Sequence, residues 1–190
     1  MPSTVRPPAV AGMFYPADPV RLEGDVRSYL ASAEPGDVGF RTRILIVPHA
    51  GYVYSGPVAA TGYQLLESMD DIRRIVMFGP SHYVWFSGLA LPEADLLETP
   101  LGTVAVEADA TTQLMANPLV AESAEAHARE HSLEVQLPFL QVVAHRIPVV
   151  PLLTGDVEPI GAADAIEPIL DDETLLLISS DLSHYHNSDT

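Results

Sequence analysis

The sequence predicts an α/β fold, a layered domain with a central, mostly parallel sheet flanked by helices. Short apolar runs that are typical of buried strands alternate along the chain with segments of helical periodicity. The apolar fraction is 47%, and no internal repeat or low-complexity linker divides the 190 residues. This length and composition are typical of one folded globular domain with a substantial core.

The composition excludes several kinds of chemistry. The 9 basic and 26 acidic residues give a net charge of −17, which disfavours nucleic acid and anionic membranes as partners. The chain has no Lys, so it has neither a P-loop lysine nor a Schiff-base lysine. It has no Cys, so a metal must be bound by His, Asp or Glu. Because no apolar run could span a membrane and no signal-peptide pattern begins the chain, we expect a cytoplasmic protein.

The N-terminal segment is expected to be irregular at first and helical after residue 18. Residues 6–19 contain four prolines, too many for a regular element, but their apolar side chains predict an arm that packs over the domain. Asp18 can cap a helix that starts at Pro19 and turns Leu22 and Val26 inward.

The run Ile44–Val47 predicts a buried central strand, because four successive apolar residues leave no polar face. Pro48 cannot donate a ladder hydrogen bond and should end the strand. His49 then follows at the carboxyl edge of the sheet, where ligands bind in open α/β folds. Its imidazole is a candidate metal ligand or acid–base group, and a turn histidine bonded to a carbonyl is the alternative.

The next predicted strand has the same ending. Residues 73–79 (RRIVMFG) form a second apolar run, which leads into Pro80 and His82. Two parallel strands that end at the same edge can bring His49 and His82 together. A helix is expected between the two strands, beginning at Pro57.

The remaining elements continue the alternation of strands and helices. We expect short strands at 87–91 and 103–106, a helix capped by Asp109, a loop at 123–129, a helix at 130–143 kinked by Pro138, a strand at 148–153, a helix at 159–170 and a strand at 174–179.

The last of these strands leads directly into Asp181, His184 and His186. With His49 and His82 they form a candidate site at the strand ends. Two histidines and a carboxylate leave open positions on a divalent metal, as in non-heme iron sites, and copper or zinc accept similar ligands. Asp181 could instead orient a histidine. A hydrogen-bonded polar cluster without a metal is the alternative to a metal site.

Residues 127–131 (HAREH) match the H-x-x-E-H pattern of inverted zinc peptidases. We interpret this match as a coincidence, because residues 124–127 offer no apolar face on which such a helix could be buried. Aromatic residues flank the two histidine turns and could form walls of a pocket, although packing explains them equally well. The candidates for lining the pocket are His131, Glu134, Tyr52, Tyr83 and His186.

The chain resembles the Memo family, protein B of the AmmeMemoRadiSam system. The resemblance covers nearly the whole chain and rests on segments in the family's order: RPPAVAGMFYPADP, VPHAGYVYSGPVAA, GPSHY, TPLGTV, EHSLEVQLPFLQ, VPLLTG and SSDLSHY. The family is related in fold to the class III extradiol dioxygenases, whose iron is held by two histidines and a carboxylate beside a catalytic histidine.

The resemblance implies specific roles at the candidate site. It implies a metal held by His49 and His82, with Asp181 and His184 nearby as catalytic residues and His184 aligned with the acid–base histidine of the dioxygenases. It also implies a third ligand, often a cysteine, from beyond residue 190. We therefore expect residues 1–190 to be a single Memo-like domain that lacks its C-terminal part.

The expected function is redox or oxygen-dependent chemistry on a small molecule at a non-heme metal site. The expected cofactor is a divalent metal, iron or copper in preference to zinc. The alternative is a non-catalytic binding module whose histidine-lined pocket holds an anionic or phosphotyrosine-like ligand. In either case the partner is a small molecule or a peptide.

Overall fold

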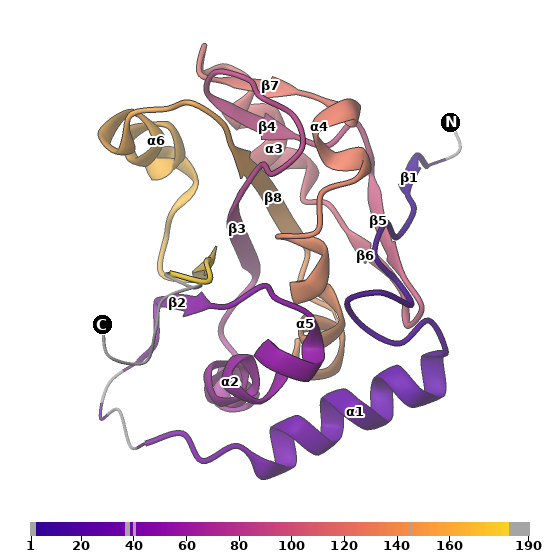
Figure 1. Cartoon of the computed structure of the whole chain (residues 1–190). Helices are drawn as coiled ribbons and strands as arrows, with labels where there is room; N and C mark the ends of the chain where they lie inside the picture. Colours follow the sequence, from indigo (N-terminus) through magenta and orange to yellow (C-terminus); the bar gives the residue numbers. More distant parts are fainter. Residues whose placement is uncertain (1–2, 37–38, 40, 145, 183–190) are drawn as a thin grey trace, which may run out of the picture.

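The computed structural model describes residues 3–36, 39, 41–144 and 146–182, which form a layered α/β structure (Figure 1). The main sheet has the strand order β2-β9-β3-β8-β4-β7. These strands are β2 (Ile44–Val47), β3 (Arg74–Pro80), β4 (Leu89–Leu91), β7 (Val120–Glu122), β8 (Val149–Thr154) and β9 (Thr174–Ser179). Neighbouring strands are parallel except β4 and β8, which are antiparallel. The predicted fold class is confirmed.

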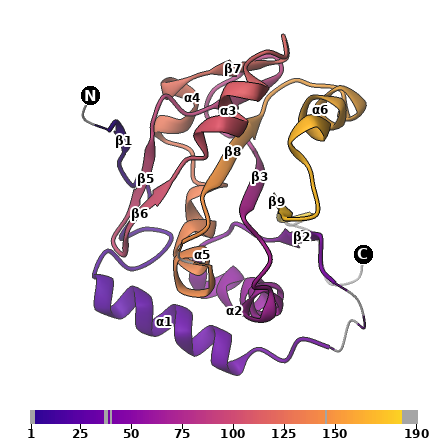
Figure 2. The same ribbon diagram turned by 180° about the vertical axis from the view of Figure 1, so that it is seen from behind.

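Helices cover both faces of this sheet (Figure 1, Figure 2). One face carries α1 (Pro19–Ser32), α2 (Tyr52–Gln64) and α5 (Leu137–Val143), and the other carries α3 (Ala108–Leu114) and α6 (Pro159–Ile166). The central strand β3 alternates between them: Ile75 and Met77 belong to the first core, and Val76 and Phe78 belong to the second. Burial on both faces explains why Ile75 to Phe78 in this strand are all apolar.

β2 differs from its prediction as a buried central strand. Among the described strands it lies at the edge of the sheet, paired with β9 alone. Leu45 and Val47 are buried under α2, but Ile44 and Ile46 are 58% and 57% exposed. The prediction failed because an apolar run does not show whether one face or both faces of a strand are covered.

A second, three-stranded sheet holds the N-terminal arm. It consists of β1 (Val5–Arg6), β5 (Leu96–Thr99) and β6 (Gly102–Ala105) in the order β1-β5-β6. β1 is parallel to β5, and β5 is antiparallel to β6. The arm packs on the domain as predicted, and its residues Val10 and Tyr15 are buried in the core beneath α1, α2 and α5.

The start of α1 was predicted correctly, and that of α2 was not. Asp18 caps α1, with its side chain accepting a hydrogen bond from the Arg21 N–H, and Pro19 is the first helical residue. α2 begins at Tyr52, after Gly51, so Pro57 lies inside the helix rather than at its start. His49 therefore lies in the turn that precedes α2, just before its N-cap Gly51.

The remaining helical segments refine the predicted boundaries. α3 is capped by Glu107, whose carboxylate accepts from the Ala110 N–H, and not by Asp109. Residues predicted as a loop include α4 (Ala124–Ala128), which is capped by Ser123. The predicted long helix after residue 130 is instead η2 (Glu134–Gln136) followed by α5. The other short turns are η1 (Leu65–Ser68) and η3 (Glu167–Ile169). Within the described part of the chain, no helix combines the length and the apolarity needed to cross a bilayer.

Candidate metal centre

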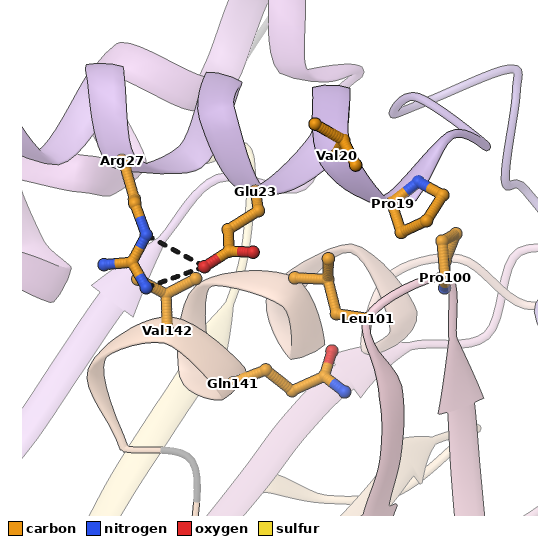
Figure 3. Close-up of a pocket in the computed structure, with 8 residues that line it drawn as sticks. All are labelled: Pro19, Val20, Glu23, Arg27, Pro100, Leu101, Gln141 and Val142. Carbon is orange, nitrogen blue, oxygen red and sulfur yellow. Dashed lines mark hydrogen bonds and ion pairs between the residues drawn. The ribbon is translucent and has the colours of Figure 1, made fainter.

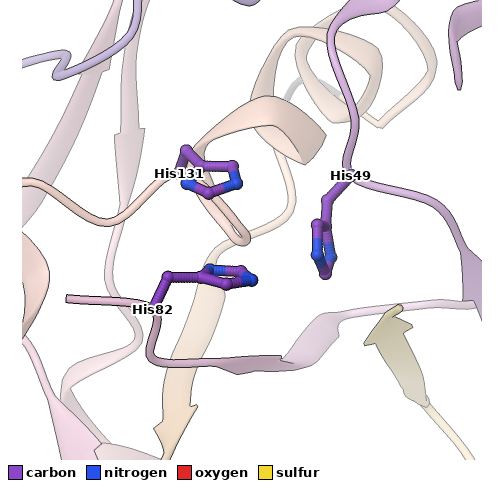
Figure 4. A group of neighbouring side chains, drawn as sticks. All are labelled: His49, His82 and His131. Carbon is purple, nitrogen blue, oxygen red and sulfur yellow. The ribbon is translucent and has the colours of Figure 1, made fainter. Parts of the chain in front are cut away.

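Three histidines from separate segments meet at the carboxyl edge of the main sheet (Figure 4). His49 follows β2, His82 follows β3, and β9 lies between these two strands. His131 comes from the irregular segment between α4 and η2. The ring centroids of His49 and His82 are 5.3 Å apart, and His131 lies 4.6 Å from His82 and 5.8 Å from His49. The predicted convergence of His49 and His82 therefore occurs.

Ser179 and Asp181 hold the ring and the backbone of His49. Its ring Nδ1 lies 3.0 Å from the hydroxyl of Ser179, the last residue of β9. Its backbone N–H donates to Asp181 Oδ1 at 2.6 Å, and its Nε2 lies 3.8 Å from Asp181 Oδ2. Burial lowers the pKa of His49, and the nearby Asp181 carboxylate offsets part of that effect. A neutral imidazole, the form that binds metals, is thereby favoured.

His82 is held by the carboxylate of Glu130. The ring Nδ1 lies 2.8 Å from Glu130 Oε1, and the backbone N–H donates to Oε2 at 2.5 Å. Glu130 is only 2% exposed and also accepts the backbone N–H groups of His131 and Ser132. Burial alone would raise the pKa of Glu130, but the hydrogen bonds from His82 and Ser132 outweigh it and lower that pKa.

The ionised form of Glu130 decides the tautomer of His82. A carboxylate only accepts hydrogen bonds, so the Nδ1 of His82 must carry the proton. In a neutral ring the other nitrogen, Nε2, then keeps its lone pair. A histidine that donates one N–H to a carboxylate and binds a metal through the other nitrogen is a common arrangement.

His131 completes the group. Its ring lies between Phe14 of the arm, at 4.5 Å between centroids, and His82. Its Nδ1 is buried without a hydrogen bond and lies 3.3 Å from Glu130 Oε1. Burial is the main cause that lowers the pKa of His131, and the carboxylate of Glu130 opposes it.

The donor set fits a divalent metal ion. One ring nitrogen from each of the three histidines lies within 4.8 Å of the other two. Metal–imidazole bonds are about 2.0–2.1 Å long, so small side-chain rotations would bring the three nitrogens onto one ion. His49 and His131 are buried, and the side chain of His82 is 38% exposed, which leaves the site open to solvent on one side.

The sequence profile of the Memo family, described as "Memo-like protein", matches residues 6–189. The chain belongs to the Memo family. A MEMO1 family protein of Aquifex aeolicus is 37% identical over 186 residues, which are 95% of this chain and 68% of that relative. MEMO1 family proteins of Ignicoccus hospitalis and Thermotoga maritima are 38% and 37% identical, each over 97% of this chain and 70% and 72% of the relative.

The other predicted site residues of this Memo-family chain lie at different distances from the three histidines. Asp181 is next to His49, as described above. The Tyr83 ring lies 6.1 Å from His131 and carries the Arg129 guanidinium 5.0 Å from its centroid. Tyr52 is buried in the core, where its hydroxyl donates to the Val135 carbonyl. His184 and His186 lie outside the described residues.

Glu134, predicted to line the pocket, instead fastens the N-terminal arm. Its carboxylate accepts the backbone N–H groups of Ala9 and Val10 and the hydroxyl of Tyr15, and it pairs with Arg6. Arg6 in turn donates to the backbone carbonyls of His127 and Glu130. Glu134 therefore supports the segment that carries Glu130 and His131.

Only part of the H-x-x-E-H segment, residues 127–131, belongs to the candidate site. His127 is buried in α4 and its Nε2 donates to the Ala90 carbonyl at 2.9 Å, so the expectation that this segment has no buried face was wrong. Burial lowers the pKa of His127 to about 4. His127 is absent from the three-histidine group, whereas Glu130 and His131 belong to the site. The pattern does not form the zinc site of a peptidase.

Sequence reasoning missed the residues that orient the histidines. Glu130 was considered only as part of the peptidase-like pattern, and Ser179 only as the end of a strand. A glutamate directly before a histidine in a segment rich in apolar residues is the signal that could have identified Glu130. No local pattern marks Ser179, because its partners come from residues 49, 132 and 136.

A separate hollow of about 280 Å³ lies between α1, the β5–β6 turn and α5 (Figure 3). Its polar groups are already engaged. Arg27 pairs with Glu23 on α1, and the Gln141 amide donates to the Gly102 carbonyl and accepts from the Thr99 hydroxyl. We assign it no ligand.

Proposed function

We propose that this Memo-family protein binds one divalent metal ion through His49, His82 and His131 and carries out redox or oxygen-dependent chemistry on a small molecule. The convergence of the three imidazoles supports this proposal most strongly. Each histidine comes from a different segment, and hydrogen bonds to Ser179 and Glu130 fix the rings of His49 and His82. Such support is typical of metal-binding histidines.

Iron or copper is proposed in preference to zinc, because the proposed redox chemistry needs a metal that changes its oxidation state and zinc does not. Three imidazoles accept all three metals, and the affinity order for divalent ions places copper above zinc. The Asp181 carboxylate beside His49 adds an oxygen donor, which suits iron. A bound iron or copper would supply the redox chemistry and open positions for oxygen and substrate.

The chain's own residues would position groups and move protons. Asp181 fixes the backbone of His49 and places a carboxylate oxygen 3.8 Å from the ring, where it can accept a proton from a bound molecule. His184 is proposed as the acid–base partner on the basis of the family resemblance. The rings of Phe14 and Tyr83 lie 4.5 Å and 6.1 Å from the ring of His131 and would offer apolar surface to a small substrate.

Metal analysis and oxygen uptake test this function together. The purified protein would be loaded with Fe(II), Cu(II) or Zn(II), and its metal content would be compared with that of H49A, H82A and H131A. H127Q is the matched control, because it alters a buried histidine outside the group and keeps a donor for the Ala90 carbonyl. We expect one ion per chain in the wild type and in H127Q, and a metal content clearly below one ion per chain in H49A, H82A and H131A. Oxygen uptake with catechol-type substrates would establish turnover; its absence with every loaded metal would reject the oxygen-dependent reaction.

A second candidate function is ligand binding without turnover. The cation of Arg129 lies over Tyr83 beside the histidine group and could pair with an anionic group on an aromatic ligand. Titration with O-phosphotyrosine would distinguish the two functions. Metal-independent binding that is lost in R129A would favour the binding module over the metal enzyme.

A further inference from the structure

We propose that Ser179 is a positioning residue that fixes His49 in the tautomer with the proton on Nδ1, so that Nε2 offers its lone pair to the metal. The role of this tautomer in metal binding rests on the metal-binding function proposed above. The assignment of the tautomer itself rests only on the hydrogen bonds around Ser179.

Ser179 is 2% exposed and has three polar neighbours. Its Oγ lies 2.5 Å from the Ser132 carbonyl oxygen, 2.8 Å from Gln136 Nε2 and 3.0 Å from His49 Nδ1. A serine hydroxyl has one proton to donate and two lone pairs that accept. Which neighbour receives the proton therefore decides the roles of the other two.

The Ser132 carbonyl can only accept, so the Ser179 proton is directed to it. The orientation of the Gln136 amide is fixed independently. Its Nε2 lies 3.0 Å from the Pro48 carbonyl oxygen, which can only accept, and its Oε1 receives the Tyr63 hydroxyl at 2.7 Å. Gln136 Nε2 is therefore a donor to Ser179 and uses one of the two lone pairs.

One accepting lone pair of Ser179 remains, and it faces His49 Nδ1. His49 must then donate from Nδ1, because the hydroxyl proton is already used. A neutral imidazole carries a single N–H, so Nε2 is left with its lone pair. The Oδ2 atom of Asp181 lies 3.8 Å from Nε2, which is beyond hydrogen-bond distance, so this carboxylate does not require a proton on Nε2.

The same tautomer results at His82 from a chemically different acceptor, the Glu130 carboxylate. The histidines after β2 and β3 are thus both set to present Nε2. At His49 the acceptor is a hydroxyl whose proton is donated elsewhere, and at His82 it is a carboxylate. Removing such a supporting group typically costs about 10–100-fold in metal affinity. We expect a loss of that size in S179A, because most of the His49 rings, about 90–99% for a 10–100-fold loss, would then carry the proton on the metal-binding nitrogen.

The test is the tautomer of His49 in the metal-free protein. Long-range ¹H–¹⁵N correlation spectra of protein with ¹⁵N-labelled histidine, at a pH where the rings are neutral, distinguish a proton on Nδ1 from one on Nε2. The wild type should show the proton of His49 on Nδ1, and S179A should shift it partly or wholly to Nε2. T174V is the matched control, because it deletes a buried hydroxyl at the opposite end of the same strand, β9, away from the histidines.

Zn(II) titration by calorimetry then links the tautomer to binding. S179A should bind about 10–100-fold more weakly than the wild type, and T174V should retain wild-type affinity. A wild-type His49 with its proton on Nε2 overturns the inference, even if S179A does not fold. An S179A variant with unchanged tautomer and affinity also overturns it. A wild type with the Nδ1 proton that binds no metal supports the tautomer assignment and rejects the proposed metal function.

Discussion

Glu130 holds His82 at two points, through the ring Nδ1 at 2.8 Å and through the backbone N–H at 2.5 Å. The carboxylate is buried, and it accepts hydrogen bonds from N–H groups of residues 82, 131 and 132. One side chain therefore sets the ring of one proposed ligand and the backbone of another, His131. A neutral amide at this position would turn a donor toward groups that are donors themselves.

The first prediction concerns the charge of Glu130. E130Q should weaken metal binding about 10–100-fold and lower the free energy of unfolding, because hydrogen bonds to a buried charged group contribute about 1.5–3 kcal/mol each. Calorimetric metal titration and urea unfolding measure the two effects. E125Q is the control, since Glu125 is exposed in the first turn of α4 and should change neither quantity. Wild-type metal affinity in E130Q would show that Glu130 does not support the site.

The second prediction concerns the dependence of stability on pH through His127. The unfolded chain binds a proton on this imidazole near pH 6.5, whereas the folded protein does so only near pH 4. The folded pKa is lowered, so this contribution to stability is present above pH 6.5 and is lost as the pH falls toward 4. The loss is on the order of 3 kcal/mol, at about 1.4 kcal/mol per pH unit.

H127Q should remove that contribution while keeping a donor for the Ala90 carbonyl. Urea unfolding at pH 7.5 and pH 4.5 would measure the difference. The wild type should lose more stability between these pH values than H127Q does. Equal losses in the two proteins would mean that the buried imidazole takes up its proton as easily as one in the unfolded chain.

The third prediction concerns the arm and its buried ion pair. R6A should destabilise the protein by about 3–5 kcal/mol, because it leaves Glu134 buried without its cation and frees the carbonyls of His127 and Glu130. R27A removes an exposed i,i+4 pair with Glu23 and should cost about 0.5 kcal/mol or less. Chemical unfolding compares the two. Similar small losses in both would contradict the role given to Arg6.

The fourth prediction concerns the contact between α1 and α2. A Cβ added at Gly56 would lie 2.7 Å from Cε2 of Tyr29, so G56A should push the helices apart and cost about 1–3 kcal/mol. Gly24 in α1 has no atom within 4 Å of such a Cβ, and G24A should stabilise the protein by about 0.4–1 kcal/mol. Thermal unfolding would show whether each substitution raises or lowers the stability. Stabilisation in G56A would show that the two helices do not pack this closely.

The central part of the site could be predicted from the sequence because it follows from the topology of a parallel sheet. His49 and His82 each end an apolar strand, and parallel strands end at one edge. His131 could be predicted only as a residue that lines the pocket. It lies in an irregular segment, and the sequence has no periodic pattern there from which its position could be predicted. Glu130 and Ser179 form hydrogen bonds with residues that are distant in the sequence, so these contacts are visible only in the folded structure.

The fold class was predicted correctly, but the position of one strand and the boundaries of some helices were not. The bounds of β9 match the prediction, since an apolar run between polar turns has unambiguous ends. β2 was expected to be central because all four of its residues are apolar, but Ile44 and Ile46 are exposed. The start of α2 was misplaced because Pro57, usually a first-turn residue, is tolerated here within the helix.

X-ray absorption of the metal-loaded protein tests the central claim, one ion held by three imidazoles, most directly. We predict about three imidazole nitrogens at roughly 2.0–2.1 Å from the metal in the wild type. In H131A that number should fall to two, with His49 and His82 still bound. A metal bound without imidazole scattering, or a spectrum that H131A leaves unchanged, would contradict the account.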